Sequence, residues 1–257
     1  MCIRDRVNSA CQPRCSYTFF QFVPFAETVQ HSRKLGEMCI RDRQYTGLII
    51  VLALLSIVYG AYAALTQDDL KKMIAYSSIS HMGFVLIGIA SFTYWGIKGA
   101  IFQMVGHGLV SAVLFMACGT IQHRANTRLI SKLGGLYYKM PKGMTLFVLA
   151  IFASMGIPGF IGFVGEFSVM VGVIKAFTWI ILPVGLGVVV AVGYYLWAFQ
   201  RFAFGEVPAY LNDIKDVHYY EAIPMLILVA LIIYFGLQPG AIMTLIEAPT
   251  QALLALQ

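Results

Sequence analysis

Charged side chains are scarce in this sequence. Of its 257 residues, 18 are lysine or arginine and 12 are aspartate or glutamate, whereas 59% are hydrophobic. A soluble domain of this length cannot bury so much apolar surface, so lipid must serve as its solvent. A helix needs roughly 20 predominantly apolar residues to cross a bilayer. The composition therefore predicts an all-α fold, a polytopic transmembrane helical bundle, and excludes an ordinary soluble enzyme.

Metal and cofactor motifs are missing as well. The cysteines follow no metal-ligand spacing and indicate no disulfide framework; they are Cys2, Cys11, Cys15, Cys39 and Cys118. No nucleotide fingerprint, iron–sulfur ligand set or flavin motif is present, so we expect no redox catalysis by this chain itself. The net charge of +6 does not indicate nucleic-acid binding, because cytoplasmic loops of membrane proteins carry the same excess of lysine and arginine.

The first 45 residues differ from the rest. The hexapeptide MCIRDR occurs at 1–6 and again at 38–43, with unrelated flanks. A structural repeat would repeat its hydrophobic pattern too. We therefore expect residues 1–45 to be an artefact or non-native segment, and residues 1–43 to be absent from the authentic gene. The apolar piece Tyr17–Phe25 is too short to span a bilayer. A transmembrane domain is predicted for 46–238 and a C-terminal tail for 239–257.

Six apolar runs follow, separated by polar or turn-rich loops, and predict about six spans. They are Thr46–Thr66, Met73–Trp95, Gly96–Ile121, Gly143–Ile174, Ala176–Gln200 and Tyr220–Gln238.

Basic residues concentrate in alternate loops. The loops 67–72, 122–142 and 201–218 hold Lys71, Lys72, Arg124, Arg128, Lys132, Lys139, Lys142, Arg201 and Lys215. The loops near Phe92 and Ile181 are almost free of charge. The positive-inside rule places the basic loops in the cytoplasm and the C-terminus on the opposite side.

Two histidines lie deep in the predicted spans. His107 is near the middle of its run, and Gln103 and Ser111, four residues to either side, fall on the same helical face. An ionisable residue at this depth costs several kcal/mol unless it faces protein or water, so it indicates function. Packing against a neighbouring helix is the alternative for this residue.

His81 has a similar setting. Ser77 and Ser78 precede it by one turn in a run that is otherwise mostly apolar, and Lys71 lies just before that run. Two histidines on adjacent spans favour a proton relay, although a packing role remains open here too.

Glu166 follows a predicted helix break. The preceding segment 155–165 contains Pro158 and four glycines, among them Gly156 and Gly159. Proline removes a helix donor and glycine tolerates unusual backbone, so a broken helix is expected near Pro158. Transporters place ion sites at such breaks. The alternative is that the glycines permit close packing and that Glu166 pairs with a structural cation.

Three strings resemble a known family: QDDLKKMIAYSSISHMG at 67–83, GAIFQMVGHGLVSAVLFMACG at 99–119 and GIPGFIGFVGEF at 156–167. They are similar to the M-type, or chain 4, antiporter-like subunit of NADH:quinone oxidoreductase. That family has about fourteen transmembrane helices, so the resemblance implies the last six, with the break in the twelfth. The earlier half has no counterpart before Thr46, which suggests a truncated gene product.

The resemblance implies proton translocation through Glu166, His107 and His81, in a translocase subunit of a prokaryotic plasma membrane. By motif position, Glu166 resembles the carboxylate of the family's broken helix, and a glutamate there favours the M type over its lysine-bearing sister subunits. The implied partners are other membrane subunits and the lipid bilayer, and FMN, iron–sulfur clusters and quinone would be bound elsewhere in the complex. The alternatives are a subunit of a multi-part sodium/proton antiporter, of a membrane-bound hydrogenase or of an F(420)H(2) dehydrogenase, or a scaffold that does not pump.

Overall fold

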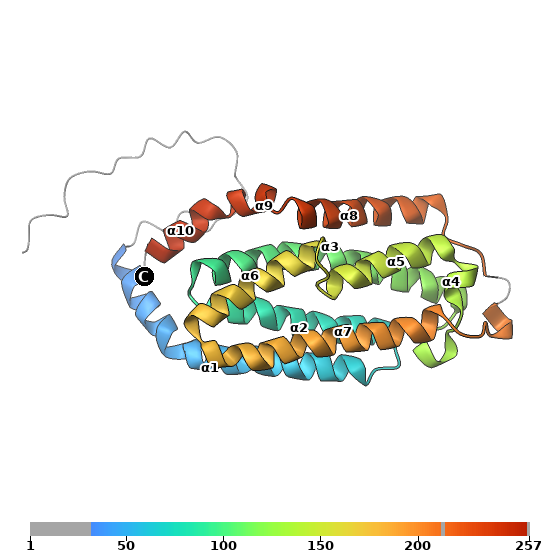
Figure 1. Cartoon of the computed structure of the whole chain (residues 1–257), viewed down its shortest axis with the longest axis horizontal. Coiled ribbons are helices and arrows are strands. Elements are labelled where there is room, and N and C mark those ends of the chain that lie inside the picture. The colour runs from blue at the N-terminus through green and yellow to red at the C-terminus, as the bar shows by residue number, and fades with distance from the viewer. Residues whose placement is uncertain (1–31, 212–213, 256–257) are drawn as a thin grey trace, which may run out of the picture.

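The computed structural model describes residues 32–211 and 214–255, and these ranges contain helices and no strands (Figure 1). The expectations for Tyr17–Phe25 and for the first MCIRDR copy lie outside them. The α-helices are α1 (Ser32–Leu65), α2 (Leu70–Ala90), α3 (Tyr94–Ala125), α4 (Leu136–Lys139), α5 (Pro141–Ser154), α6 (Ile161–Ala176), α7 (Ile181–Ala203), α8 (Tyr219–Leu237), α9 (Gly240–Leu245) and α10 (Glu247–Ala255). Three short 3-10 helices join them, at Ile130–Lys132, Thr178–Ile180 and Ala209–Leu211. The predicted all-α class is confirmed.

Five stretches in the described ranges are long and apolar enough to cross a membrane. They are Tyr45–Leu65, Leu70–Ala90, Tyr94–Ala125, Thr178–Ala203 and Tyr219–Leu237. The sixth predicted span consists of α5 and α6, which have 14 and 16 residues and lie nearly end to end along the bundle (Figure 1). Neither is long enough to span alone, but together they cover the length of a span. The protein is thus an integral membrane protein with one broken span.

The second span begins and ends earlier than the apolar run predicts. Asp69 accepts hydrogen bonds from the backbone N–H groups of Lys71 and Lys72, so α2 starts at Leu70. At the other end the chain turns sharply at Phe92, where φ is +47°. The Thr93 side chain then caps α3 through the N–H of Gly96. Hydropathy missed these boundaries because the capping residues, not the apolar content, fix the helix ends.

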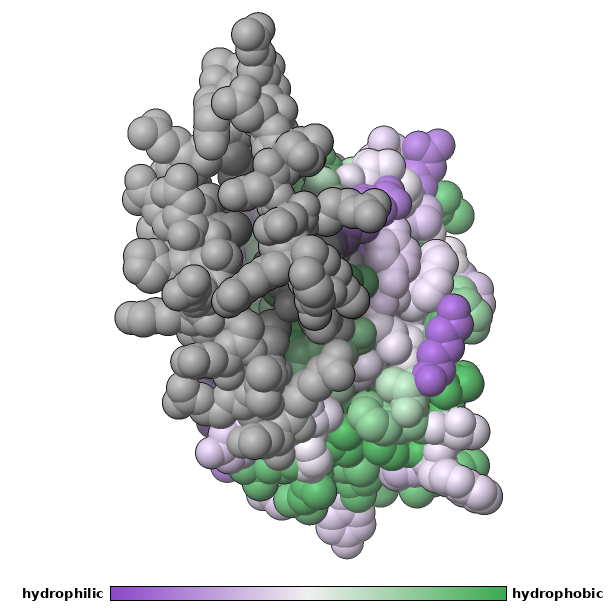
Figure 2. All heavy atoms as spheres, turned by 90° about the vertical axis from the view of Figure 1, so that its left-hand side faces the viewer, coloured by the Kyte–Doolittle hydropathy of each residue, from purple (hydrophilic) through white to green (hydrophobic). Residues whose placement is uncertain are grey.

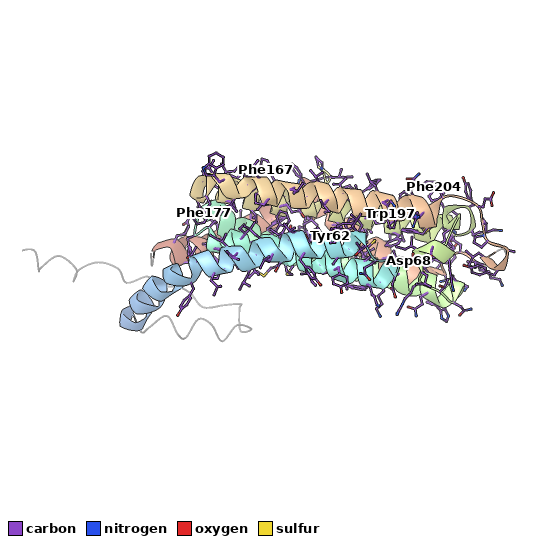
Figure 3. All side chains as sticks on the ribbon, turned by 90° about the horizontal axis from the view of Figure 1, so that it is seen from below. Tyr62, Asp68, Phe167, Phe177, Trp197 and Phe204 are labelled. Carbon is purple, nitrogen blue, oxygen red and sulfur yellow. The ribbon has the colours of Figure 1, made fainter. Side chains whose placement is uncertain are left out.

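Consecutive long helices run in alternate directions, so the loops gather at two ends of the bundle (Figure 1). The basic loops form one end, where Figure 3 shows Asp68 and Phe204. The nearly uncharged turns form the other end, together with Phe177 and α10 (Figures 1 and 3). On the part of this second end that is not covered by grey atoms, strongly hydrophilic residues are few and scattered (Figure 2). The turns between the helices thus keep the charge asymmetry on which the orientation rests, whereas the N-terminal part of α1, which includes Arg33, Lys34, Arg41 and Arg43, lies at the second end (Figure 1).

Helices α3 and α6 touch through glycines. A Cβ added at Gly172 would lie 2.3 Å from the backbone nitrogen of Gly96, and one added at Gly99 would lie 2.6 Å from the backbone nitrogen of Val169. No side chain fits between the two backbones at these points, which is how small residues let membrane helices approach. This contact holds the C-terminal half of α6 against the first turns of α3.

The segment after α8, predicted as a tail, forms α9 and α10 and packs back on the bundle. The Tyr94 hydroxyl donates to Glu247 Oε1 over 2.9 Å, and Lys98 Nζ donates to the same hydroxyl over 2.8 Å. These bonds fasten α10 to the first turn of α3.

Candidate functional site

The break between α5 and α6 occupies residues 155–160. Gly156 and Gly159 adopt φ values of +69° and +100°, which side chains rarely tolerate, and Pro158 lies between them. Helix α8 covers the break, because a Cβ at Gly236 would lie 2.4 Å from the carbonyl oxygen of Gly159. The Gly159 carbonyl, one of the backbone groups near the break, thus faces protein, as polar backbone must at membrane depth.

Glu166 sits in the second turn of α6, and its carboxylate reaches back to the break. A Cβ added at Gly156 would lie 2.9 Å from Glu166 Oε2, so only glycine leaves room there. Side chains on a helix lean toward its N-terminus, which directs this one to the break. The site therefore depends on the break for space as well as for position.

His81 of α2 meets this carboxylate. Its Nδ1 lies 3.0 Å from Glu166 Oε1, and the two residues are 4% and 5% exposed. A histidine and a carboxyl group so far from water are stable together only if their remaining polar atoms are also hydrogen-bonded. His81 meets this condition, because its Nε2 lies 3.1 Å from the Ser154 hydroxyl in the last turn of α5. The pair thus joins α2 to both halves of the broken span.

Gln103 of α3 also contacts the Glu166 carboxylate. Its Nε2 donates to Glu166 Oε1 over 3.5 Å, a long hydrogen bond. Its Oε1 is buried and has no hydrogen-bond partner among the described residues. Buried polar atoms are normally hydrogen-bonded, so Gln103 Oε1 needs a donor other than the surrounding side chains.

His107 lies on the far side of a small cavity. Its ring centroid is 5.5 Å from that of His81, with no hydrogen bond between them. The cavity has a volume of about 10 Å³, and its polar lining comes from His81, Gln103, His107, Ser154 and Glu166. A volume of this size holds about one water molecule. The cavity therefore connects the pair, the orphan Gln103 oxygen and His107.

Other residues predicted for the site fall into two groups. Ser77 belongs to the buried network, because its hydroxyl accepts from Tyr195. Ser78 and Ser111 bond backbone carbonyls of their own helices instead, and Lys71 is exposed at the start of α2. The structure brings none of these last three to the His81–Glu166 pair.

Two residues of the network were missed in the sequence. Ser154 donates to the hydroxyl of Tyr195 in α7 over 2.7 Å, and Tyr195 donates to Ser77 over 2.9 Å. Tyr195 is fully buried. A tyrosine in an apolar span is typical of core packing and carries no signal of its own. Ser154 could have been found in the sequence, because it is a single hydroxyl residue just before the helix break.

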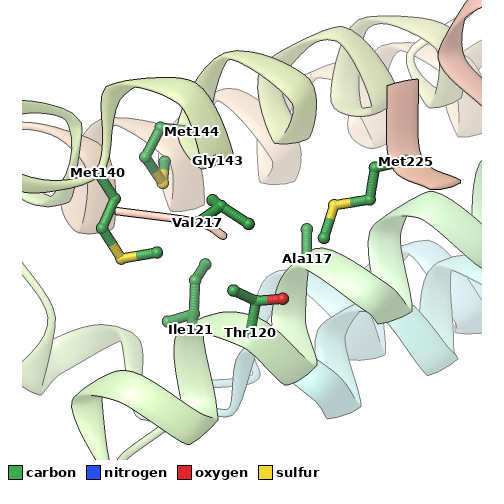
Figure 4. Close-up of a pocket in the computed structure, with 8 residues that line it drawn as sticks. All are labelled: Ala117, Thr120, Ile121, Met140, Gly143, Met144, Val217 and Met225. Carbon is green, nitrogen blue, oxygen red and sulfur yellow. The ribbon is translucent and has the colours of Figure 1, made fainter. Parts of the chain in front are cut away.

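A second small cavity, at the basic end of the bundle, differs in chemistry (Figure 4). It also measures about 10 Å³ and is lined by flexible methionines, including Met140, Met144 and Met225, with Thr120 as its one hydroxyl. Methionine side chains fill irregular gaps of this kind. No ionisable side chain lines it, so it is not a candidate for proton transfer. In the described part of the chain no three His, Cys, Asp or Glu residues are grouped to hold a metal ion.

Comparisons with known proteins agree with this architecture. A family model described as NADH:quinone oxidoreductase/Mrp antiporter, transmembrane, matches residues 32–192. Subunit M of the F(420)H(2) dehydrogenase of Methanosarcina mazei is 42% identical over 217 residues, which are 81% of this chain and 43% of the relative. Subunit M of the NADH-quinone oxidoreductase of Rickettsia felis is 40% identical over 214 residues, 83% of this chain and 43% of the relative.

Solved structures give the same assignment. A chain of respiratory complex I from Thermus thermophilus superposes with a TM-score of 0.79 at 31% identity, covering 84% of this chain and 45% of that chain. A chain of the Mrp complex of Dietzia superposes with a TM-score of 0.73 at 21% identity, which shows a shared fold. The chain spans less than half the length of these curated relatives. It belongs to the NADH:quinone oxidoreductase/Mrp antiporter family of membrane proteins.

Proposed function

We propose that this chain acts in proton translocation as a membrane subunit of an NADH:quinone oxidoreductase. The observation that carries the proposal is the buried His81–Glu166 pair beside the broken span. Relatives named as subunit M of that enzyme share 40% identity with the chain. The chain itself performs no redox step in this scheme. Electrons pass through FMN, iron–sulfur clusters and quinone held by other subunits.

The pair is suited to exchanging a proton. Imidazole and carboxylate are both groups that can bind and release a proton, and nearby charges alter the balance between the two states. At 3.0 Å they share one hydrogen bond, so a proton can move between Nδ1 and Oε1 with little displacement of the helices. A small change in the local field then decides whether the pair holds or releases that proton.

The cavity beside the pair would carry the proton on to His107. A water molecule there would have the Gln103 carbonyl oxygen as an acceptor and the Glu166 carboxylate and His107 ring as further partners. Protons would pass between the pair and His107 through that water. The path thus runs from the broken span across to α3, transverse to the bundle axis.

The orientation follows from the basic loops. Their end of the bundle would face the cytoplasm of a prokaryotic cell, and the turn at Phe92 and the C-terminal helices would face the opposite side of the plasma membrane. Other membrane subunits would contact the lipid-facing helices. In this orientation the path would lie between two aqueous compartments.

A second candidate is the corresponding subunit of an F(420)H(2) dehydrogenase, because the relative of that name shares 42% identity with this chain. The proton path would be the same, and only the electron donor of the complex would differ. Oxidation of each donor by membranes containing the assembled complex would separate the two.

The test of the proposal is Glu166→Gln in the assembled complex. Glutamine keeps the size and the hydrogen-bonding capacity of the side chain but cannot release a proton. We expect proton uptake into inside-out vesicles to fall strongly while the amount of assembled complex stays nearly unchanged. Glu206→Gln, in an exposed loop at the basic end, is the matched control and should pump normally. Normal pumping by Glu166→Gln would refute the proposal, and failed assembly would support the scaffold alternative.

A further inference from the structure

A chain of hydroxyl groups leads away from the His81 ring on the side opposite Glu166. His81 Nε2 lies 3.1 Å from Ser154 Oγ, which lies 2.7 Å from the Tyr195 hydroxyl. The Tyr195 hydroxyl lies 2.9 Å from Ser77 Oγ, which lies 2.7 Å from the carbonyl oxygen of Ile74. All three hydroxyl-bearing residues are buried, at 7%, 0% and 1% exposure for Ser154, Tyr195 and Ser77.

The last member fixes the direction of every bond in this chain. The Ile74 carbonyl can only accept, so the single hydrogen of Ser77 points to it. Ser77 then accepts from Tyr195, whose single hydrogen is used in that bond, and Tyr195 accepts from Ser154 in the same way. Ser154 has no hydrogen left for the imidazole. His81 Nε2 must therefore carry a hydrogen and donate it to Ser154 Oγ.

We propose that Tyr195, with Ser154 and Ser77, is a positioning residue that keeps Nε2 of His81 protonated and confines proton exchange to the Nδ1–Oε1 bond with Glu166. This deepens the proton-translocation proposal and rests on it for its physiological role. The pair then has two forms with the same number of protons. One is imidazolium with carboxylate, and the other is neutral imidazole with protonated carboxyl.

The hydroxyl chain holds a proton and does not conduct one. Conduction would need an acceptor beyond Ser77, and an amide carbonyl oxygen is too weak a base to take a proton. Ile74 also accepts from Ser78 Oγ over 3.1 Å, so it is already a well-bonded acceptor. Protons therefore enter and leave the pair through the cavity, which is lined by His107, Gln103 and Ser154, and do not pass through Tyr195 and Ser77. The network makes proton movement one-sided at His81.

The titratable groups near His81 in the described ranges come from three helices. They are Glu166 on α6, His107 on α3, and the two tyrosines 194 and 195 on α7. Tyr194 offers an internal control, because it is as deeply buried as Tyr195 and its hydroxyl lies near those of Ser77 and Tyr195, yet it makes no hydrogen bond of normal geometry among the described residues. Replacing each tyrosine by phenylalanine removes the same atom from adjacent positions.

The experiment measures which ring nitrogen of His81 carries hydrogen. The full chain, labelled with ¹⁵N-histidine, is reconstituted in a lipid bilayer, and its ring-nitrogen signals are recorded at neutral pH by solid-state NMR. The His81 signals are identified by their loss in His81→Gln. We expect Nε2 to be protonated in the unaltered chain and in Tyr194→Phe. In Tyr195→Phe the Ser154 hydrogen is free to turn to the ring, so the Nε2 signal should move to the unprotonated position in most molecules.

Ser77→Ala provides a second break in the chain that leaves the tyrosine ring in place. It frees the Tyr195 hydrogen for Ser154, and then the Ser154 hydrogen for the imidazole, so it should give the same Nε2 change. An unprotonated Nε2 in the unaltered chain would overturn the inference, as would a Tyr195→Phe or Ser77→Ala spectrum that matches Tyr194→Phe. The readout needs no pumping. A protonated Nε2 together with normal pumping by Glu166→Gln would refute the proposed function and leave this assignment standing.

Discussion

The close contact between α3 and α6 lets us predict how one added methyl group, at Gly99, changes stability and proton pumping. In Gly99→Ala the new Cβ would lie 2.6 Å from the backbone nitrogen of Val169 and 2.8 Å from Ser168 Cβ. Two of its three nearest atoms are backbone, so no rotamer change relieves the overlap. To reach ordinary contact near 3.4 Å, α6 must move from α3 by roughly 0.8 Å.

That movement affects both stability and the site. Overpacking of this kind costs about 1–3 kcal/mol, against which the better helix propensity of alanine returns about 1 kcal/mol. A shift of roughly 0.8 Å in α6 would also stretch the 3.0 Å bond between His81 and Glu166 beyond hydrogen-bonding distance. We therefore expect a net loss of up to about 2 kcal/mol in the free energy of unfolding and a marked loss of proton pumping.

Gly108→Ala is the matched control on the same helix. A Cβ at Gly108 meets nothing within 4 Å, so the propensity gain should appear alone. The assays are unfolding in mixed detergent micelles and proton uptake by vesicles that contain the assembled complex. If Gly99→Ala were as stable as Gly108→Ala and pumped as well, the close packing of α3 on α6 would not determine the geometry of the site.

Two further predictions follow from the ends of the bundle and from the break. In a cysteine-free background, a cysteine at Asn126 should react only with a reagent on the cytoplasmic side and one at Phe92 only from the opposite side; reversed labelling would refute the orientation. Gly156→Ala should reduce pumping more than Gly159→Ala, although both positions have positive φ, because only the first methyl group would touch Glu166. Equal losses in the two variants would mean that backbone strain alone explains the effect.

Sequence reasoning predicted the broken span well because its cause is local. Pro158 and the glycines around it are adjacent in the chain, and the break falls among them. The meeting of His81 with Glu166 could not be predicted in the same way, because 85 residues separate them. Helical periodicity places a residue on a face but does not say which helix that face contacts. The resemblance to a known family grouped the two residues by motif alone.

The predicted polar face of α3 shows that helical periodicity alone does not place every residue correctly. Gln103, His107 and Ser111 were expected on one face, but positions eight apart on an α-helix diverge by about 80° around its axis. Gln103 therefore reaches Glu166, His107 borders the cavity, and Ser111 bonds the carbonyl of Gly108. The hydroxyl chain was missed for a different reason. Tyr195 stands in an apolar run beside one other tyrosine, Tyr194, and its role exists only in the packed bundle.

The central claim is that His81 and Glu166 act as one proton-exchanging unit, and a double-mutant cycle tests it most directly. Proton uptake by vesicles would be measured for His81→Gln, Glu166→Gln and the combined variant, each corrected for the amount of assembled complex. The account predicts that either single change abolishes most pumping and that the double variant pumps no worse than the single ones, because residues of one unit are not additive. Losses that multiply in the double variant would contradict it, since two independent steps would then carry the proton.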